Sequence, residues 1–157
     1  MMEDAVILLS GGMDSGVLLA WSRPRYAAVH ALSFDYGSKH AAKEVYMARR
    51  LAQEYGATFT EVGLPFINAL FTSSLLQSGE AIPDGPYRPD SISSTVVPFR
   101  NGIMLAIATG YAETHRIGTV LIASHTGDHP VYPDCTSEFT DAMSQASTLG
   151  TFTKVMV

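Results

Sequence analysis

The chain has 157 residues, which predicts one domain because domains usually comprise about 100–200 residues. Hydrophobic residues make up 46% and charged residues 16%, a balance that excludes a disordered tail and a coiled coil. Ten Lys and Arg against fifteen Asp and Glu give a net charge of −5, so the sequence lacks the positive charge of a nucleic-acid or anionic-membrane binder. We therefore expect a small-molecule ligand and neither of those partners.

Cysteine content and the N-terminus bear on the compartment. A single cysteine, Cys135, cannot form an internal disulfide, which favours a reducing cytosol. Glu3 and Asp4 precede the first apolar run, whereas a secretory signal starts with basic residues. The apolar stretch 103–108 is far shorter than the roughly 20 residues of a membrane span. We expect a cytoplasmic protein.

Strand and helix patterns alternate along the chain. Short apolar runs rich in branched residues are typical of buried parallel strands, and apolar residues at three- and four-residue steps are typical of amphipathic helices. Residues 63–94 contain four prolines and form an irregular excursion, a kind of loop that often carries function. We expect strands over residues 5–9, 27–34, 58–62 and 119–123, and helices over 16–21, 38–55, 66–75, 98–116 and 137–147.

This order predicts an α/β fold with an open, mainly parallel sheet and helices on both faces, in the manner of a Rossmann fold. In such sheets, ligands bind beyond the carboxyl ends of the strands. Functional residues are therefore expected in the loops that follow the strands.

The loop Ser10-Gly11-Gly12-Met13-Asp14-Ser15 follows the first expected strand. Adjacent glycines allow close backbone approach, and the free N–H groups at a helix start attract an anion such as phosphate. Gly11 and Gly16 have the spacing of a Walker A loop, but Val17 and Leu18 stand where that loop needs Lys and Ser or Thr. The sequence thus predicts a phosphate site of another kind, the alternative being a glycine-rich turn without a ligand.

The hexapeptide resembles the SGGxDS pyrophosphate-binding loop of the PP-loop ATPases, which activate a carboxyl, carbonyl or amide group with ATP. Three further blocks follow in order. They are Phe-Asp-Tyr-Gly-Ser-Lys-His at 34–40, Pro-Phe-Arg-Asn at 98–101, and a block from Asp128 through Tyr-Pro-Asp-Cys at 132–135. Together the four blocks resemble the 7-cyano-7-deazaguanine synthase family, the queuosine-pathway branch of the PP-loop ATPases, over nearly the whole chain.

The resemblance implies an ATP-dependent carbon–nitrogen ligase. Such an enzyme converts 7-carboxy-7-deazaguanine and ammonia to 7-cyano-7-deazaguanine (preQ0) through an adenylated carboxylate. It implies ATP and Mg²⁺ as cofactors, and it favours a homodimer. Adenylation suits the loop chemistry, since backbone N–H donors can hold the departing pyrophosphate without a catalytic base.

The resemblance also assigns residues to ATP and to catalysis. Asp14 orients the phosphates, through magnesium, or caps the following helix, and the two roles are compatible. Lys39, beside His40, neutralises charge on phosphate or belongs to a solvated helix start. Arg100 offers a planar fork to a carboxylate or phosphate, the alternative being a structural role as a cap or in an ion pair. The expected ATP-binding residues are Ser10, Gly11, Gly12, Met13, Asp14, Ser15, Phe34 and Tyr36, and the expected catalytic residues are Asp14, Ser15, Lys39 and Arg100.

The last block is assigned to the deazaguanine substrate. An acidic side chain can accept hydrogen bonds from the amino and ring N–H groups of the base, and Tyr132 can stack on it. The expected substrate-binding residues are Arg100, Asn101, Asp128, Tyr132 and Asp134. A nucleophilic Cys135 is disfavoured, since no general base can be assigned to it, and the alternative is an inert, half-buried thiol.

A metal site is the alternative for the last loop, because five side chains there can ligate zinc: His125, Asp128, His129, Asp134 and Cys135. We favour base recognition and expect no metal site in this chain. Members of the family continue further and carry four cysteines that bind structural zinc. We therefore expect residues 1–157 to be one PP-loop nucleotide-binding domain, truncated before the zinc segment.

Two other functions remain open at this point. A different PP-loop amidating or tRNA-modifying enzyme would share the first loop, although a tRNA binder should be more basic and usually has catalytic cysteines. A truncated nucleotide-binding domain without turnover would share it as well. Measurable turnover would distinguish the ligase from such a non-catalytic domain.

Overall fold

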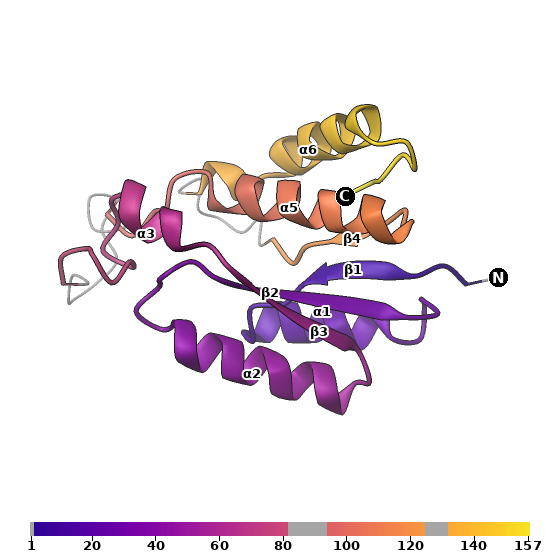
Figure 1. The fold of residues 1–157 in the computed structure, drawn as a ribbon, viewed down its shortest axis with the longest axis horizontal. Coiled ribbons are helices and arrows are strands. Elements are labelled where there is room, and N and C mark those ends of the chain that lie inside the picture. The colour runs from indigo at the N-terminus through magenta and orange to yellow at the C-terminus, as the bar shows by residue number, and fades with distance from the viewer. Residues whose placement is uncertain (1, 82–93, 125–131) are drawn as a thin grey trace.

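A computed structural model describes residues 2–81, 94–124 and 132–157 of the chain. Its centre is a four-stranded sheet in the order β3-β2-β1-β4, in which every neighbouring pair is parallel (Figure 1). The strands are β1 (Ala5–Leu8), β2 (Val29–Asp35), β3 (Thr58–Gly63) and β4 (Val120–Leu121).

Helices cover both faces of this sheet. In Figure 1, α1 and α2 lie on one face and α5 on the other, with α6 on the outer side of α5. The α/β fold expected from the sequence is thereby confirmed. The helices are α1 (Met13–Ser22), α2 (Ala41–Glu54), α3 (Pro65–Leu70), α5 (Arg100–His115) and α6 (Ser137–Gly150), with a 3₁₀ turn η1 (Pro133–Cys135) before α6.

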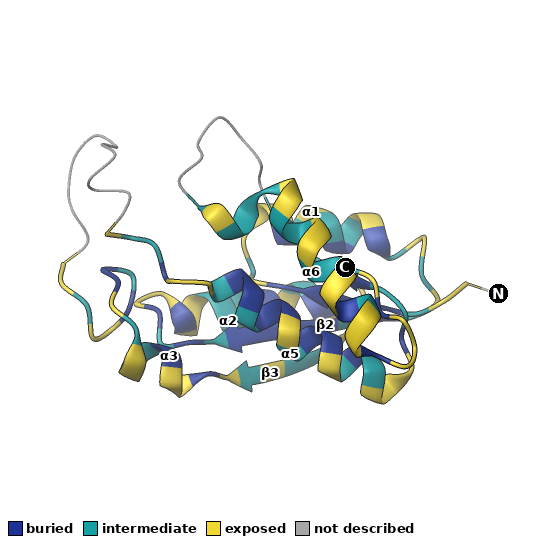
Figure 2. Ribbon diagram, turned by 90° about the horizontal axis from the view of Figure 1, so that it is seen from above, coloured by how far each residue is buried: buried dark blue, intermediate teal, exposed yellow. Residues whose placement is uncertain are grey.

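Strand β1 is buried on both faces, which explains its continuously apolar sequence. Val6 and Leu8 belong to the core cluster on the α5 side of the sheet. Ile7 and the following Leu9 belong to the cluster on the α1 and α2 side. Figure 2 shows buried residues along the central strands and on the helix faces that meet them. The sheet therefore separates two cores, and β1 contributes to each.

Small residues bring the helices close to the sheet and to one another. Helix α2 buries Ala41, Ala48 and Ala52, and it ends before Gly56, whose left-handed φ of 63° supports the helix end predicted there. Helix α5 lies between the sheet and α6. The hydroxyl groups of Thr109 and Ser147, both buried, hydrogen-bond at 2.9 Å between the two helices.

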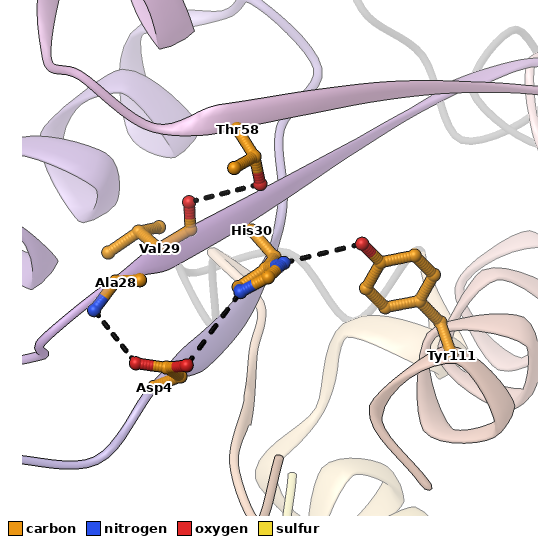
Figure 3. A network of polar contacts seen from close by, with 6 residues as sticks. All are labelled: Asp4, Ala28, Val29, His30, Thr58 and Tyr111. Atoms are coloured by element: carbon orange, nitrogen blue, oxygen red, sulfur yellow. Dashed lines mark hydrogen bonds and ion pairs between the residues drawn. The ribbon is translucent and has the colours of Figure 1, made fainter. Parts of the chain in front are cut away.

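A polar network joins the amino ends of β1 and β2 to α5, at the sheet edge opposite the loops that follow the strands (Figure 3). The Asp4 carboxylate accepts a hydrogen bond from the Ala28 N–H at 2.9 Å, and its second oxygen lies 3.9 Å from Nε2 of His30. Nδ1 of His30 lies 3.3 Å from the Tyr111 hydroxyl. This network fixes the amino-terminal edge of the sheet.

The last residues fold back beside β4. Glu113 of α5 accepts hydrogen bonds from the Thr153 hydroxyl, from the Thr153 N–H at 3.1 Å and from the Phe152 N–H at 2.9 Å. These bonds, with that from the hydroxyl foremost, hold the pKa of Glu113 below its usual value. Met156 then forms a parallel bridge with Thr119.

Several elements differ in extent from the sequence expectation, among them α1, β4 and α3. Helix α1 begins at Met13 rather than at residue 16, because the second half of the glycine-rich loop is already helical. Strand β4 has two residues rather than five, since the chain leaves the ladder after Leu121 and residues 122–124 line a cavity instead. Helix α3 ends at Leu70. Within the described ranges, no helix is both long and apolar enough to cross a membrane.

A pair of leucines tests the core. Leu105 of α5 is fully buried, whereas Leu149 of α6 is 82% exposed. We expect Leu105→Ala to lower the free energy of unfolding by about 2–5 kcal/mol, because it leaves a cavity. The matched Leu149→Ala should change it by less than about 0.5 kcal/mol. Urea unfolding monitored by circular dichroism measures both, and equal effects would contradict this description of the core.

Candidate active site at the carboxyl ends of the strands

A cavity of about 350 Å³ lies where β1, β2 and β4 end. The glycine-rich loop, α2, the start of α5 and η1 also contribute to its wall. This is the edge of a parallel sheet at which ligands bind. Its lining residues are Leu8, Leu9, Ser10, Asp14, Ser15, Phe34, Tyr36, Glu44, Arg100, Asn101, Met104, Ile122, Ala123, Ser124 and Cys135.

Close packing against α2 sets the shape of the glycine-rich loop. Gly11 has a left-handed φ of 80°. A Cβ atom at this position would lie 2.5 Å from the Glu44 carbonyl oxygen and 2.8 Å from the Ala48 nitrogen. These are backbone atoms of a helix and cannot move aside cheaply. Only glycine fits here, for both reasons.

The two serines of the loop hold it closed. The buried Ser15 hydroxyl accepts a hydrogen bond from the Ser10 N–H at 3.2 Å and donates one to the Gly12 carbonyl at 3.1 Å. The two serine hydroxyls lie 3.0 Å apart. The first N–H groups of α1 have no carbonyl partner within the helix, as at every helix start. The loop is thus rigid and presents donors beside the cavity.

Two carboxylates line the cavity near this loop. Asp14 lies in the first turn of α1, but the N-cap is Gly12 and no side chain caps this helix end. The capping role considered for Asp14 is therefore wrong. Glu44 of α2 accepts a hydrogen bond from the Ser38 hydroxyl at 3.0 Å. Sequence reasoning missed Glu44, which looked like one of several charged residues on the polar face of its helix.

The start of α5 has an unusual backbone. Phe99, the N-cap residue, has φ 53° and ψ 27°, a left-handed conformation that costs a non-glycine residue roughly 1–2 kcal/mol. Arg100 follows as the first helical residue. Its Nη1 donates a hydrogen bond to the Tyr36 hydroxyl at 3.0 Å, and its guanidinium carbon lies 5.5 Å from the centre of that ring.

The electrostatics of Arg100 suit an anion site. Burial lowers the pKa of its guanidinium, but Tyr36, Asp134 and Cys135 outweigh this effect and leave the pKa above its usual value. Among the described residues, no carboxylate lies within ion-pair distance of Arg100. The cavity therefore holds a permanent cation whose hydrogen-bond partner is a neutral hydroxyl.

Asn101 connects the start of α5 to η1. Its backbone N–H donates to the Asp134 carboxylate at 2.9 Å, so this carboxylate caps α5 from another segment. Its side-chain amide donates to the Asp134 carbonyl at 3.1 Å and to Sγ of Cys135 at 3.3 Å. Two residues expected to bind substrate, Asn101 and Asp134, thus contact each other, and Asn101 alone of the two lines the cavity.

The Cys135 thiol lines the cavity and is half-buried. Burial raises its pKa and so does Asp134, whereas Arg100 and the hydrogen bond from Asn101 act in the opposite direction without cancelling the increase. The thiol therefore stays protonated near neutral pH. It accepts a hydrogen bond and is not an activated nucleophile.

Other expected site residues lie elsewhere. The Lys39 ammonium donates to the carbonyl oxygens of Ser74 at 2.7 Å, Gly79 at 3.3 Å and Glu80, and Lys39 is not among the cavity residues. It holds the segment after α3 in place. The Tyr132 hydroxyl lies 3.2 Å from that of Thr95, also outside the cavity lining.

Three of the five residues of the metal-site alternative lie outside the described residues. They are His125, Asp128 and His129, and Asp128 was also expected to bind the substrate. Within the ranges that the structure describes, no three His, Cys, Asp or Glu side chains are grouped so that they could hold a metal ion.

The chain matches the family model of the queuosine biosynthesis protein QueC over residues 4–157. It belongs to this family. A 7-cyano-7-deazaguanine synthase of Desulfotalea psychrophila is 54% identical over 156 residues, which are 99% of this chain and 71% of that protein. A synthase of the same name from Porphyromonas gingivalis is 47% identical over 155 residues, 99% of this chain and 70% of that protein. The resemblance found in the four sequence blocks is confirmed.

Two solved structures share the fold. One is a 4-thiouridine synthetase in complex with RNA and ATP, with a TM-score of 0.58 at 19% identity, over 91% of this chain and 34% of that chain. The other is a predicted tRNA methyltransferase subunit of Methanocaldococcus jannaschii, with a TM-score of 0.56 at 16% identity, over 93% of this chain and 64% of that chain. At these identities the likeness concerns the fold alone.

Two glycines of the same region test the loop. We expect Gly11→Ala to lower the free energy of unfolding by about 1–3 kcal/mol, because the new methyl group meets the α2 backbone in a left-handed conformation. Gly16→Ala is the matched control, since its Cβ would lie 3.5 Å from Leu51 and alanine favours the helix. Thermal unfolding measures both, and a Gly11→Ala protein as stable as Gly16→Ala would refute the described loop.

The thiol of Cys135 supplies a pH test. Because its folded-state pKa is raised, alkylation by iodoacetamide should accelerate at a higher pH in the folded chain than in the urea-unfolded chain. Arg100→Ala should move the folded midpoint higher still, since Arg100 stabilises the thiolate, and should leave the unfolded midpoint unchanged. A folded midpoint below the unfolded one would contradict the described surroundings of Cys135.

Proposed function

We propose that the chain catalyses the ATP-dependent conversion of 7-carboxy-7-deazaguanine and ammonia to 7-cyano-7-deazaguanine. The observation that carries the proposal is one cavity in which the glycine-rich loop and the Arg100 guanidinium meet, in a chain of the QueC family. The loop suits the phosphates of a nucleotide. The guanidinium suits the carboxylate that the nucleotide has to activate.

The ATP half of the site consists of the loop and its neighbours. Close packing of Gly11 against α2 fixes the shape of the loop, and the start of α1 supplies N–H donors and a favourable dipole. Ser10 and Ser15 keep this loop in shape through their mutual hydrogen bonds. Phe34 and Tyr36 offer apolar ring surface at the same cavity. When bound, ATP supplies the adenylyl group that turns a carboxylate oxygen into a leaving group.

Two carboxylates fit a magnesium ion that would accompany ATP. Asp14 and Glu44 line the same cavity, and hard oxygen donors are what Mg²⁺ prefers. Because Glu44 already accepts a hydrogen bond from Ser38, its side chain is oriented before any ligand arrives. We assign Asp14 and Glu44 to this role together.

The carboxylate half of the site centres on Arg100. Its fork can hold the substrate carboxylate while the Tyr36 hydroxyl accepts one of its N–H groups. Asn101 and Asp134 act on the substrate through position, since they fix the start of α5 against η1. Base recognition by Asp128 and Tyr132 rests on the family resemblance, and Lys39 orders the segment after α3 rather than touching phosphate.

The reaction needs two activations of the same carbon. In the first, the carboxylate attacks the α-phosphorus of ATP and pyrophosphate leaves. Ammonia then displaces AMP and forms an amide, with loss of one proton. In the second, the amide oxygen attacks the α-phosphorus of another ATP, pyrophosphate leaves and one N–H proton is lost. Departure of AMP and loss of the remaining N–H proton then leave the nitrile. Held geometry and fixed N–H donors suffice for both, because each leaving group departs as an anion.

Product analysis tests this function directly. We expect mass spectrometry to detect 7-cyano-7-deazaguanine, AMP and pyrophosphate after incubation of the chain with ATP, Mg²⁺, ammonium and 7-carboxy-7-deazaguanine. Asp14→Asn should reduce turnover by on the order of a hundred-fold or more, as expected when charge stabilisation at a reacting phosphate is removed. Val17→Ala, an exposed position one turn further along α1, is the control and should match the unmodified chain.

The possible outcomes separate the candidate functions. ATP binding without product would assign the chain to a nucleotide-binding domain without turnover and would overturn the proposal. AMP formation with a different carbonyl substrate would assign it to another amidating reaction. Full activity of Asp14→Asn would remove the phosphate role of the loop.

A further inference from the structure

We propose that Phe99 is a positioning residue that aims the Arg100 guanidinium into the cavity, and that its ring does so through contact with Gly102 and Phe139. The proposal rests on the proposed function only where it concerns substrate binding by Arg100. The geometry of Phe99 itself is independent of it.

The first observation is a strained backbone directly before the key cation. Phe99 adopts φ 53° and ψ 27°, a region that a bulky aromatic residue rarely enters. Its carbonyl accepts the Ile103 N–H at 3.1 Å, so the first turn of α5 is built on it. Strained residues at a site usually serve that site. Since Arg100 is the next residue, the conformation at Phe99 sets the direction in which its side chain leaves the backbone.

The second observation is the place of the Phe99 ring. The residue is 57% exposed, so burial in a core does not account for its position. The ring lies over Gly102 so closely that a Cβ there would be 2.6 Å from its Cζ and 2.7 Å from its Cδ1. It also meets the Phe139 ring edge to face, with 5.6 Å between centroids and an angle of 89°. The missing side chain at Gly102 is the space that lets the ring stay there.

The third observation is that one segment holds both sides of this turn. Asp134 accepts the Asn101 N–H, and five residues later Phe139 packs on Phe99. Thr136 lies between them and caps α6 by accepting the Phe139 N–H at 3.2 Å. The first turn of α5 is thereby held by a hydrogen bond at one point and by a ring contact at another. Arg100 lies between these two points and reaches Tyr36.

Glycine and phenylalanine variants test the contact. Gly102→Ala adds a methyl group that must displace the Phe99 ring, whereas Gly110→Ala on the same helix adds one in open space and is the matched control. Phe99→Gly removes the ring but tolerates the left-handed backbone. Phe99→Tyr keeps the ring and is the conservative variant.

Two measurements report on the position of the Arg100 side chain, and one of them does not depend on enzymatic activity. We expect Gly102→Ala and Phe99→Gly each to raise KM for 7-carboxy-7-deazaguanine by on the order of ten- to a hundred-fold, with a smaller change in kcat, as for a displaced binding group. In the chain labelled with ¹⁵N-arginine, the Nε signal of Arg100, assigned by its loss in Arg100→Lys, should move toward the position of a solvated arginine in both variants. Gly110→Ala and Phe99→Tyr should match the unmodified chain in both readouts.

The double variant decides whether the ring mediates the effect. Without the ring, the three closest contacts of a methyl group at residue 102 are removed, so Gly102→Ala combined with Phe99→Gly should be no worse than Phe99→Gly alone. Additive effects, or an unchanged Arg100 signal in Gly102→Ala, would overturn the proposal. If one single variant fails to fold by circular dichroism, the other still decides it. Absence of product in the unmodified chain, with the expected shifts of the Arg100 signal, would refute the proposed function and leave the positioning role intact.

Discussion

The close contact between Gly11 and the backbone of α2 is the constraint on which the site depends. It fixes where the first loop lies relative to the neighbouring helix, and it brings Glu44 to the same cavity as Asp14. Strand β1 holds the loop in position for this contact, because the strand is buried on both faces and cannot shift without disturbing two cores. A rigid central strand thus delivers a loop of defined shape to the point where the sheet opens.

Much of the fold could be predicted because it follows from local patterns. Continuous apolar runs predicted the buried strands, and apolar residues at three- and four-residue steps predicted the amphipathic helices. The glycine-rich loop was also predictable, since its position after β1 and its composition point to the same chemistry. The short β4 was not, because the length of a ladder depends on where the partner chain turns away, and no residue between 119 and 123 signals that.

The contacts of the expected site residues could be predicted only in part, because they depend on the tertiary fold. Residue types reveal which side chains can bind an anion, but not which of them are already engaged by the protein. Lys39 has the right charge, yet backbone carbonyls of a distant segment occupy its ammonium. Asn101 and Asp134 have the right donors and acceptors, yet they are used on each other. Such pairings join residues more than thirty positions apart, and only the folded chain brings them together.

Arg100 differs from these residues in its hydrogen-bond partner, which is the hydroxyl group of Tyr36. Tyr36 accepts one hydrogen bond from the guanidinium, and among the described residues this group has no other hydrogen bond and no ion pair. A carboxylate partner would have stabilised the cation fully and closed the site to anions. A neutral hydroxyl orients the same group and keeps its charge available. The choice of tyrosine at this point therefore explains how a half-buried arginine can be held in one direction and still bind a carboxylate from solution.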